Sequence, residues 1–200
     1  MLSAEFWEEQ YRKLFEVLAR NSAKAARAGL KDGAEQLGIE IDFSLLNEYV
    51  VAWVQANCAE VARTITKTSM DAFIGKYEEW ATQGAPLRSL IKELKENYGH
   101  KAKVIAVTET TRAFAYGNLA VFRHEGVEAI RWNTAEDELV CEICAPLAGT
   151  TAAMSVGFPE GIVAPPAHPN CRCWITPVIP EREAISGEEL EAEELAIEEN

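Results

Sequence analysis

The chain has 200 residues, of which 48% are hydrophobic and 26% charged, and this composition is ordinary for a globular protein. It contains no apolar run near the roughly 20 residues of a membrane-spanning helix, and its charged N-terminus lacks the apolar stretch of a signal peptide. Of the net charge of −13, the last twenty residues carry −8, from nine Glu and one Arg. Since nucleic-acid binding depends on cations that neutralise phosphates, we expect weak or no direct nucleic-acid binding.

The first part of the chain has a helical pattern. Residues 3–31 place apolar positions among Glu, Lys and Arg, and the sequence predicts breaks around 31–33 and at Gly38. The same helix carries six cations that could face packaged DNA or an acidic protein surface, although a solvated helix face explains them more simply; they are Arg12, Lys13, Arg20, Lys24, Arg27 and Lys31.

Three further helices are predicted. Residues 43–84 give the strongest pattern, with apolar side chains three or four apart and Ser44 as the candidate N-cap. A short helix over 87–98 and a longer one over 101–126 follow, and Gly126 supplies a C-cap.

The character of the chain changes after Gly126. Residues 127–134 alternate apolar and polar side chains, and 171–179 are rich in β-branched and aromatic residues, so both are predicted as short strands. The Gly- and Pro-rich segment between them is predicted as loop. The expected fold class is therefore α+β: a mainly helical N-terminal two-thirds followed by a small β-containing, Cys/His-rich cap.

Five metal-capable side chains gather in this cap, namely Cys141, Cys144, His168, Cys171 and Cys173. Two short-spaced pairs separated by a loop suit the four tetrahedral ligands of structural zinc, and five candidates in one set favour a closed structural site over a catalytic one. Two alternatives stay open: reduced, buried thiols with no metal, or a redox pair or disulfide.

Other candidate residues have simpler interpretations. Cys58 lies on the apolar face of the long helix and is expected to be a buried hydrophobe. His100 is predicted at a helix start and His124 in a last turn, and Glu109 and Arg112 are spaced to form an ion pair. The sequence has no phosphate-binding glycine loop, GxSxG or HExxH motif.

An ordered series of short motifs runs through residues 42–178. In chain order they are Ile65-Thr66-Lys67-Thr68, Thr108-Glu109-Thr110-Thr111-Arg112, Gly126-Val127, Trp132-Asn133-Thr134, Asp137-Glu138, Cys141 with Cys144, Leu147 with Gly149, and Pro165-Pro166-Ala167-His168-Pro169-Asn170-Cys171-Arg172-Cys173. In this order and at these spacings they resemble the phage Mu F-like minor head proteins, also called phage head morphogenesis proteins.

The resemblance implies a non-enzymatic virion protein of the head interior, present in few copies and associated with the portal. Such a protein is synthesised in the bacterial host cytoplasm and acts in head assembly, DNA packaging or ejection. It also implies three parts: an N-terminal helical segment (1–41), the head morphogenesis domain (42–178) and an acidic tail (179–200). The alternative function is a metal-dependent hydrolase or transferase that uses Glu109 and Arg112 near the Cys/His cluster.

Overall fold

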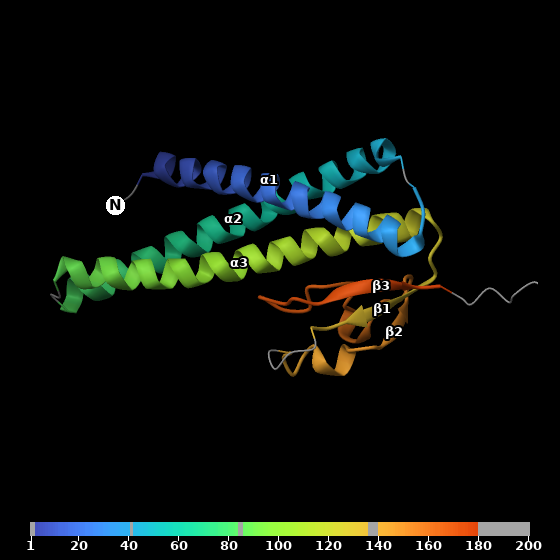
Figure 1. Ribbon diagram of the computed structural model, residues 1–200. Coiled ribbons are helices and arrows are strands. Elements are labelled where there is room, and N and C mark those ends of the chain that lie inside the picture. Colours follow the sequence, from blue (N-terminus) through green and yellow to red (C-terminus); the bar gives the residue numbers. More distant parts are fainter. Residues whose placement is uncertain (1–2, 41, 84–85, 136–139, 180–200) are drawn as a thin grey trace, which may run out of the picture.

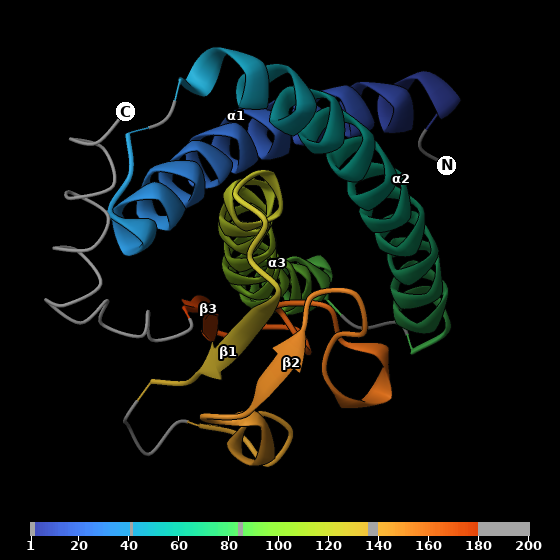
Figure 2. The same cartoon turned by 90° about the vertical axis from the view of Figure 1, so that its right-hand side faces the viewer.

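The computed structural model describes residues 3–40, 42–83, 86–135 and 140–179. Three long helices, α1 (Ala4–Leu37), α2 (Phe43–Gln83) and α3 (Leu87–His124), precede a sheet of β1 (Ala129–Asn133), β2 (Thr151–Ala153) and β3 (Trp174–Val178). The α3 helix lies between the other helices and the sheet in both views (Figures 1 and 2). The expected α+β class, with helices first and a small Cys/His-rich cap last, is confirmed.

The α1 helix is longer than predicted. Its N-cap is Ser3, whose Oγ accepts the Phe6 N–H at 3.2 Å. Its end is at Gly38, whose left-handed conformation (φ 68°) directs the N–H to the carbonyls of Ala34 and Glu35. The predicted break at 31–33 is wrong, because Gly33 stays helical and packs against α3, where an added Cβ would lie 3.3 Å from Val121 Cβ.

The α1 and α3 helices touch backbone to backbone. A Cβ on Gly117 would lie 2.1 Å from the Ala26 carbonyl oxygen, and one on Gly29 would lie 2.0 Å from that of Phe114. Next to this contact, the fully buried Asn118 donates from Nδ2 to the Gly29 carbonyl and to Asp32 Oδ2, both at 2.9 Å. Glycine is required here by proximity, because any side chain would push the helices apart.

The α3 helix is also continuous where the sequence predicts two helices. It runs through Gly99, beside which there is open space, so His100 lies within the helix and not at its start. The helical prediction for α2 is confirmed, but α2 begins at Phe43, so Ser44 lies inside it and the N-cap assignment is wrong. The proposed α2 end at Gly84 lies outside the described residues. Within the described residues, no helix is long and apolar enough to cross a membrane.

The sheet is antiparallel, in the order β2-β1-β3. β1 and β3 occupy the two segments predicted as strands, and Trp132 pairs with Ile175 in their register. The three-residue β2 was not predicted. Both Trp132 and Ile175 are fully buried, and the Trp132 ring meets Phe158 edge-on at 5.2 Å between centroids. This small core supports the loops that carry the cysteines.

Candidate metal centre

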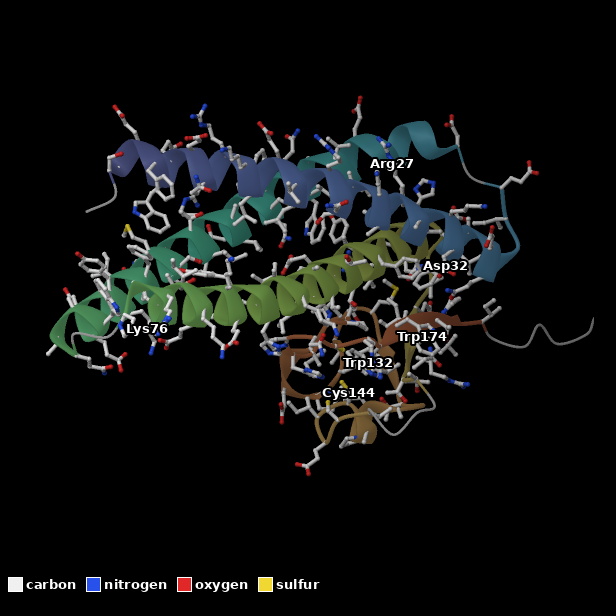
Figure 3. The ribbon with its side chains drawn as sticks, turned by 60° about the vertical axis from the view of Figure 1, so that its left-hand side comes forward. Arg27, Asp32, Lys76, Trp132, Cys144 and Trp174 are labelled. Carbon is white, nitrogen blue, oxygen red and sulfur yellow. The ribbon has the colours of Figure 1, made fainter. Side chains whose placement is uncertain are left out.

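The metal-capable side chains come from two loops of the cap. Cys141 and Cys144 flank a tight turn that leads into the 3-10 helix Ala145–Leu147, and the N–H groups of Cys144 and Ala145 both bond to the Cys141 carbonyl. His168, Cys171 and Cys173 lie on the segment that enters β3. Figure 3 shows Cys144 beside Trp132 in the cap, below α3. The structure thus brings together residues that are up to 32 positions apart in sequence (173 − 141).

All five side chains line one cavity of about 30 Å³. His168 Nε2 lies 3.0 Å from Cys141 Sγ and 3.2 Å from Cys144 Sγ, while the Sγ atoms of Cys144 and Cys171 are 3.8 Å apart. Their ligand atoms form two compact groups, one of Cys141, Cys144 and His168 and one of Cys144, Cys171 and Cys173. Cys144 belongs to both groups and joins the two loops.

The donor set fits a tetrahedral metal ion. Zinc bonds of about 2.3 Å to sulfur and 2.0 Å to nitrogen put neighbouring ligand atoms about 3.5–3.8 Å apart, which the three separations above match to within about half an ångström. Cys171 does not lie within 4.8 Å of both Cys141 and His168, so a larger shift is needed to bring the two groups around one ion. His168 Nδ1 lies 2.8 Å from the Pro169 carbonyl oxygen, to which it can donate its proton. This bond leaves the Nε2 lone pair facing the two cysteines, as in metal-ligating histidines.

The thiols also interact with one another. The hydrogen bond from the Cys173 thiol, opposed by burial, lowers the pKa of Cys171 to about 5. Burial raises the pKa of Cys144 to about 12, and the bond to Cys171 followed by burial raises that of Cys173. The Cys144 N–H also points to Cys141 Sγ at 3.4 Å. Among Cys144, Cys171 and Cys173, Cys171 is therefore the thiol that most readily supplies a thiolate.

Two threonines of α3 hold the second loop. The Thr108 hydroxyl accepts the Asn170 N–H at 2.8 Å, and the Thr111 hydroxyl donates to the Cys171 carbonyl at 2.9 Å. Asn170 lies in the left-handed region (φ 65°), where an asparagine is tolerated, and this turn presents both groups to α3. In the sequence these threonines stand out only as part of a motif. Their spacing of three residues places them on one face of a helix, and this was the available signal for a shared contact.

The other candidate residues lie outside the cluster. Glu109 is 8% exposed, accepts from Asn57 Nδ2 at 3.0 Å and pairs with Arg112 Nε at 3.4 Å, which confirms the predicted ion pair. Neither Glu109 nor Arg112 lines the cavity of the four cysteines and His168. Arg112 instead lines a neighbouring pocket with Pro166 and Ala167.

Cys58 and His124, both outside the cap, have structural positions. Cys58 is buried on α2, as predicted, and burial raises the pKa of its thiol. His124 lies in the last turn of α3, as predicted.

Comparison with known proteins gives one family. The model of the family described as Phage Mu protein F like protein matches residues 74–176, from the second half of α2 to β3. Neither the curated proteins nor the solved structures contain a significant match. The matched span includes all five cap residues and both α3 threonines and covers just over half of the chain. The chain therefore belongs to the Phage Mu protein F like family.

Proposed function

We propose that this chain is a minor head protein of a tailed phage or prophage. The family match over residues 74–176 carries the proposal, because this family suggests a phage head morphogenesis protein. The protein would act in the head interior, in a few copies that contact the portal and each other, and would take part in assembly and in DNA packaging or ejection. It would be synthesised in the host cytoplasm and enter the virion from there.

A structural role without catalysis is consistent with the site. The buried Glu109 is held by Asn57 and Arg112, and the cysteine cavity of about 30 Å³ has room for one ion and no substrate. The chain is proposed to have three parts, an N-terminal helical segment (1–41), the head morphogenesis domain (42–178) and an acidic tail (179–200). The α1 helix nevertheless shares one core with α3 through Gly29 and Gly117.

Within the cap, one zinc ion is proposed as a structural cross-link. Cys141, Cys144, His168 and Cys171 would be the four ligands, because these atoms form a chain of close neighbours from one loop to the other. Cys173 groups only with Cys144 and Cys171, and its thiol donates to Cys171, so it would support the ligand. The ion would supply a cross-link between loops that have little core of their own.

The proposed role is tested in the phage or induced prophage that encodes the chain. A nonsense mutation in the gene should reduce infectious particles, and complementation should restore them. Mass spectrometry of purified heads should find the chain in few copies relative to the major capsid protein. Normal infectivity without it, together with its absence from purified heads, would contradict the role.

A further inference from the structure

The α1 helix exposes a basic surface that the proposed head function does not use. Residues 17–31 contain four cations and no acidic residue, and we call these four, Arg20, Lys24, Arg27 and Lys31, the basic stripe. At 3.6 residues per turn they fall within one sector of about 60°. All four are exposed, on the side of α1 opposite to its buried residues Ser22, Ala26 and Gly29.

The surroundings of the stripe set its extent. Toward the N-terminus, Glu16 separates the stripe from Lys13, which is paired with Glu9 at 2.6 Å. At the other end, Lys31 lies 3.5 Å from Glu35, with 73% of its side chain exposed. Figure 3 labels Arg27 on the side of the molecule away from Trp132 and Cys144 of the cap. The stripe is therefore accessible to a segment that approaches from outside the helical body.

The most acidic segment of the sequence is its last twenty residues. Residues 181–200 hold nine Glu and one Arg, whereas residues 1–180 together carry only −5 (−13 + 8). Opposite charges this dense attract over about 8–10 Å at physiological salt. No segment of the same length is more basic than residues 17–31 or more acidic than residues 181–200.

The described part of the chain ends near the stripe. Val178 of β3 pairs with Ala129 of β1. The β1 strand follows α3 after a sharp turn, in which the Val127 N–H bonds to the Phe122 carbonyl. The α1 and α3 helices run in parallel, since Gly29 meets Phe114 and Gly33 meets Val121. The last described residues of the chain therefore lie near the C-terminal end of α1, the end of the helix that carries Lys31.

The tail is long enough to follow the stripe. Arg20 to Lys31 spans about 16 Å of helix, and twenty extended residues reach about 65 Å. We propose that the acidic tail, residues 181–200, docks on the basic stripe of α1 within the same chain. The contact places tail carboxylates beside the exposed side chains of the stripe, and it is independent of the metal and of the role in the head.

Carbodiimide coupling of the full chain tests this contact, since it joins a lysine amine to a carboxylate only where they touch. Mass spectrometry of an equimolar mixture of light and heavy-isotope chains identifies the joined peptides. We expect Lys24 and Lys31 to be coupled to tail glutamates, with both joined peptides from the same chain, either light or heavy. The yield of this coupling should fall at least fivefold in 1 M NaCl. Lys92 on α3, with 78% of its side chain exposed, should give at most one fifth of that yield.

Two test variants and one control variant separate the effect of charge attraction from that of proximity. Arg20→Gln with Arg27→Gln should lower the coupling of Lys24 and Lys31 at least threefold, while Arg12→Gln with Arg88→Gln, which removes equal charge elsewhere, should leave it unchanged. The triple variant Glu188→Gln, Glu189→Gln and Glu191→Gln should also lower the coupling of Lys24 and Lys31, and it leaves the helices and the sheet unchanged in sequence. Coupling between light and heavy chains would assign the stripe to a second copy and overturn the proposal. Coupling that is equal at Lys92, or insensitive to salt and to these variants, would also overturn it.

Discussion

At the scale of single residues, two glycines determine how the helical body packs. An alanine at Gly117 would bring its Cβ to 2.1 Å from the Ala26 carbonyl oxygen and 2.7 Å from the Leu30 nitrogen, and backbone atoms cannot move aside. We expect Gly117→Ala to lower the free energy of unfolding by about 3 kcal/mol or more, at the upper end of the usual cost of overpacking. Denaturant unfolding followed by circular dichroism measures it.

Gly75 provides the matched control. It lies inside α2 with nothing within 4 Å of an added Cβ, so alanine meets no obstacle there. Gly75→Ala should raise the free energy of unfolding by about 0.5–1 kcal/mol, because alanine loses less backbone entropy in a helix. If both alanine variants change stability in the same direction and by similar amounts, the close contact of α1 and α3 is not as described.

The proposed ligand set makes separate predictions for each cysteine. Elemental analysis of the purified full chain should find close to one zinc per chain. Cys141→Ser, Cys144→Ser and Cys171→Ser should each lower that content to less than half. Cys173→Ser should keep most of it, because its thiol supports Cys171 from outside the four ligands.

Cys58→Ser is the control for general damage. Cys58 is buried on α2, so its substitution can weaken the core but should leave the zinc content unchanged. Equal zinc loss in Cys58→Ser and Cys144→Ser would mean that the cysteine variants act through unfolding, and the ligand assignment would lose its support.

The sequence predicted which residues form the cluster, but not that their ligand atoms form two groups that share Cys144. Spacing alone places Cys141 with Cys144 and Cys171 with Cys173. The separation of the two groups at Cys144 depends on the Asn170 turn and on Thr108 and Thr111, which are contacts between distant segments. The close contact of α1 with α3 at Gly29 and Gly33 was not predicted for a related reason. A glycine in a sequence can mark a helix break or a close helix contact, and only the position of α3 decides between the two.

At the scale of elements, boundaries were harder to predict than the elements themselves. The helical stretch of α2 and the strands β1 and β3 were predicted in place, because their apolar patterns are strong. The break predicted at Gly99 was wrong, since a glycine in a helix costs only about 1 kcal/mol and the rest of α3 outweighs it. The three-residue β2 is too short for any pattern to show.

The hydrogen bond from the Thr111 hydroxyl of α3 to the Cys171 carbonyl of the cap can be removed by one substitution. Thr111→Val keeps the shape of the side chain but leaves the Cys171 carbonyl without its donor, at a cost of about 1–2 kcal/mol. We expect faster amide exchange in residues 168–173 and weaker zinc retention during dialysis against a chelator. Thr110→Val, at an exposed position on the same helix, should change neither. The reverse pattern, with Thr110→Val more damaging, would contradict the proposed link.

At the scale of the whole molecule, the cap is held on the helical body by contacts with α3, and the proposed metal ion would cross-link the loops within the cap. One hydrophobic core runs from the body, where α1, α2 and α3 contribute Leu30, Val54 and Val121, into the cap. The cap buries fewer large side chains, among them Trp132 and Ile175, and two of its loops meet at the cysteines. Metal removal should therefore act on the cap far more than on the body.

Hydrogen exchange of the full chain, measured by mass spectrometry before and after chelation of the metal, tests this claim most directly. The account predicts that peptides from 140–178 lose most of their protection, that α1 and the second half of α3 keep theirs, and that added zinc restores the cap. Unchanged protection in 140–178 after complete metal removal, or equal loss across the helices, would contradict it.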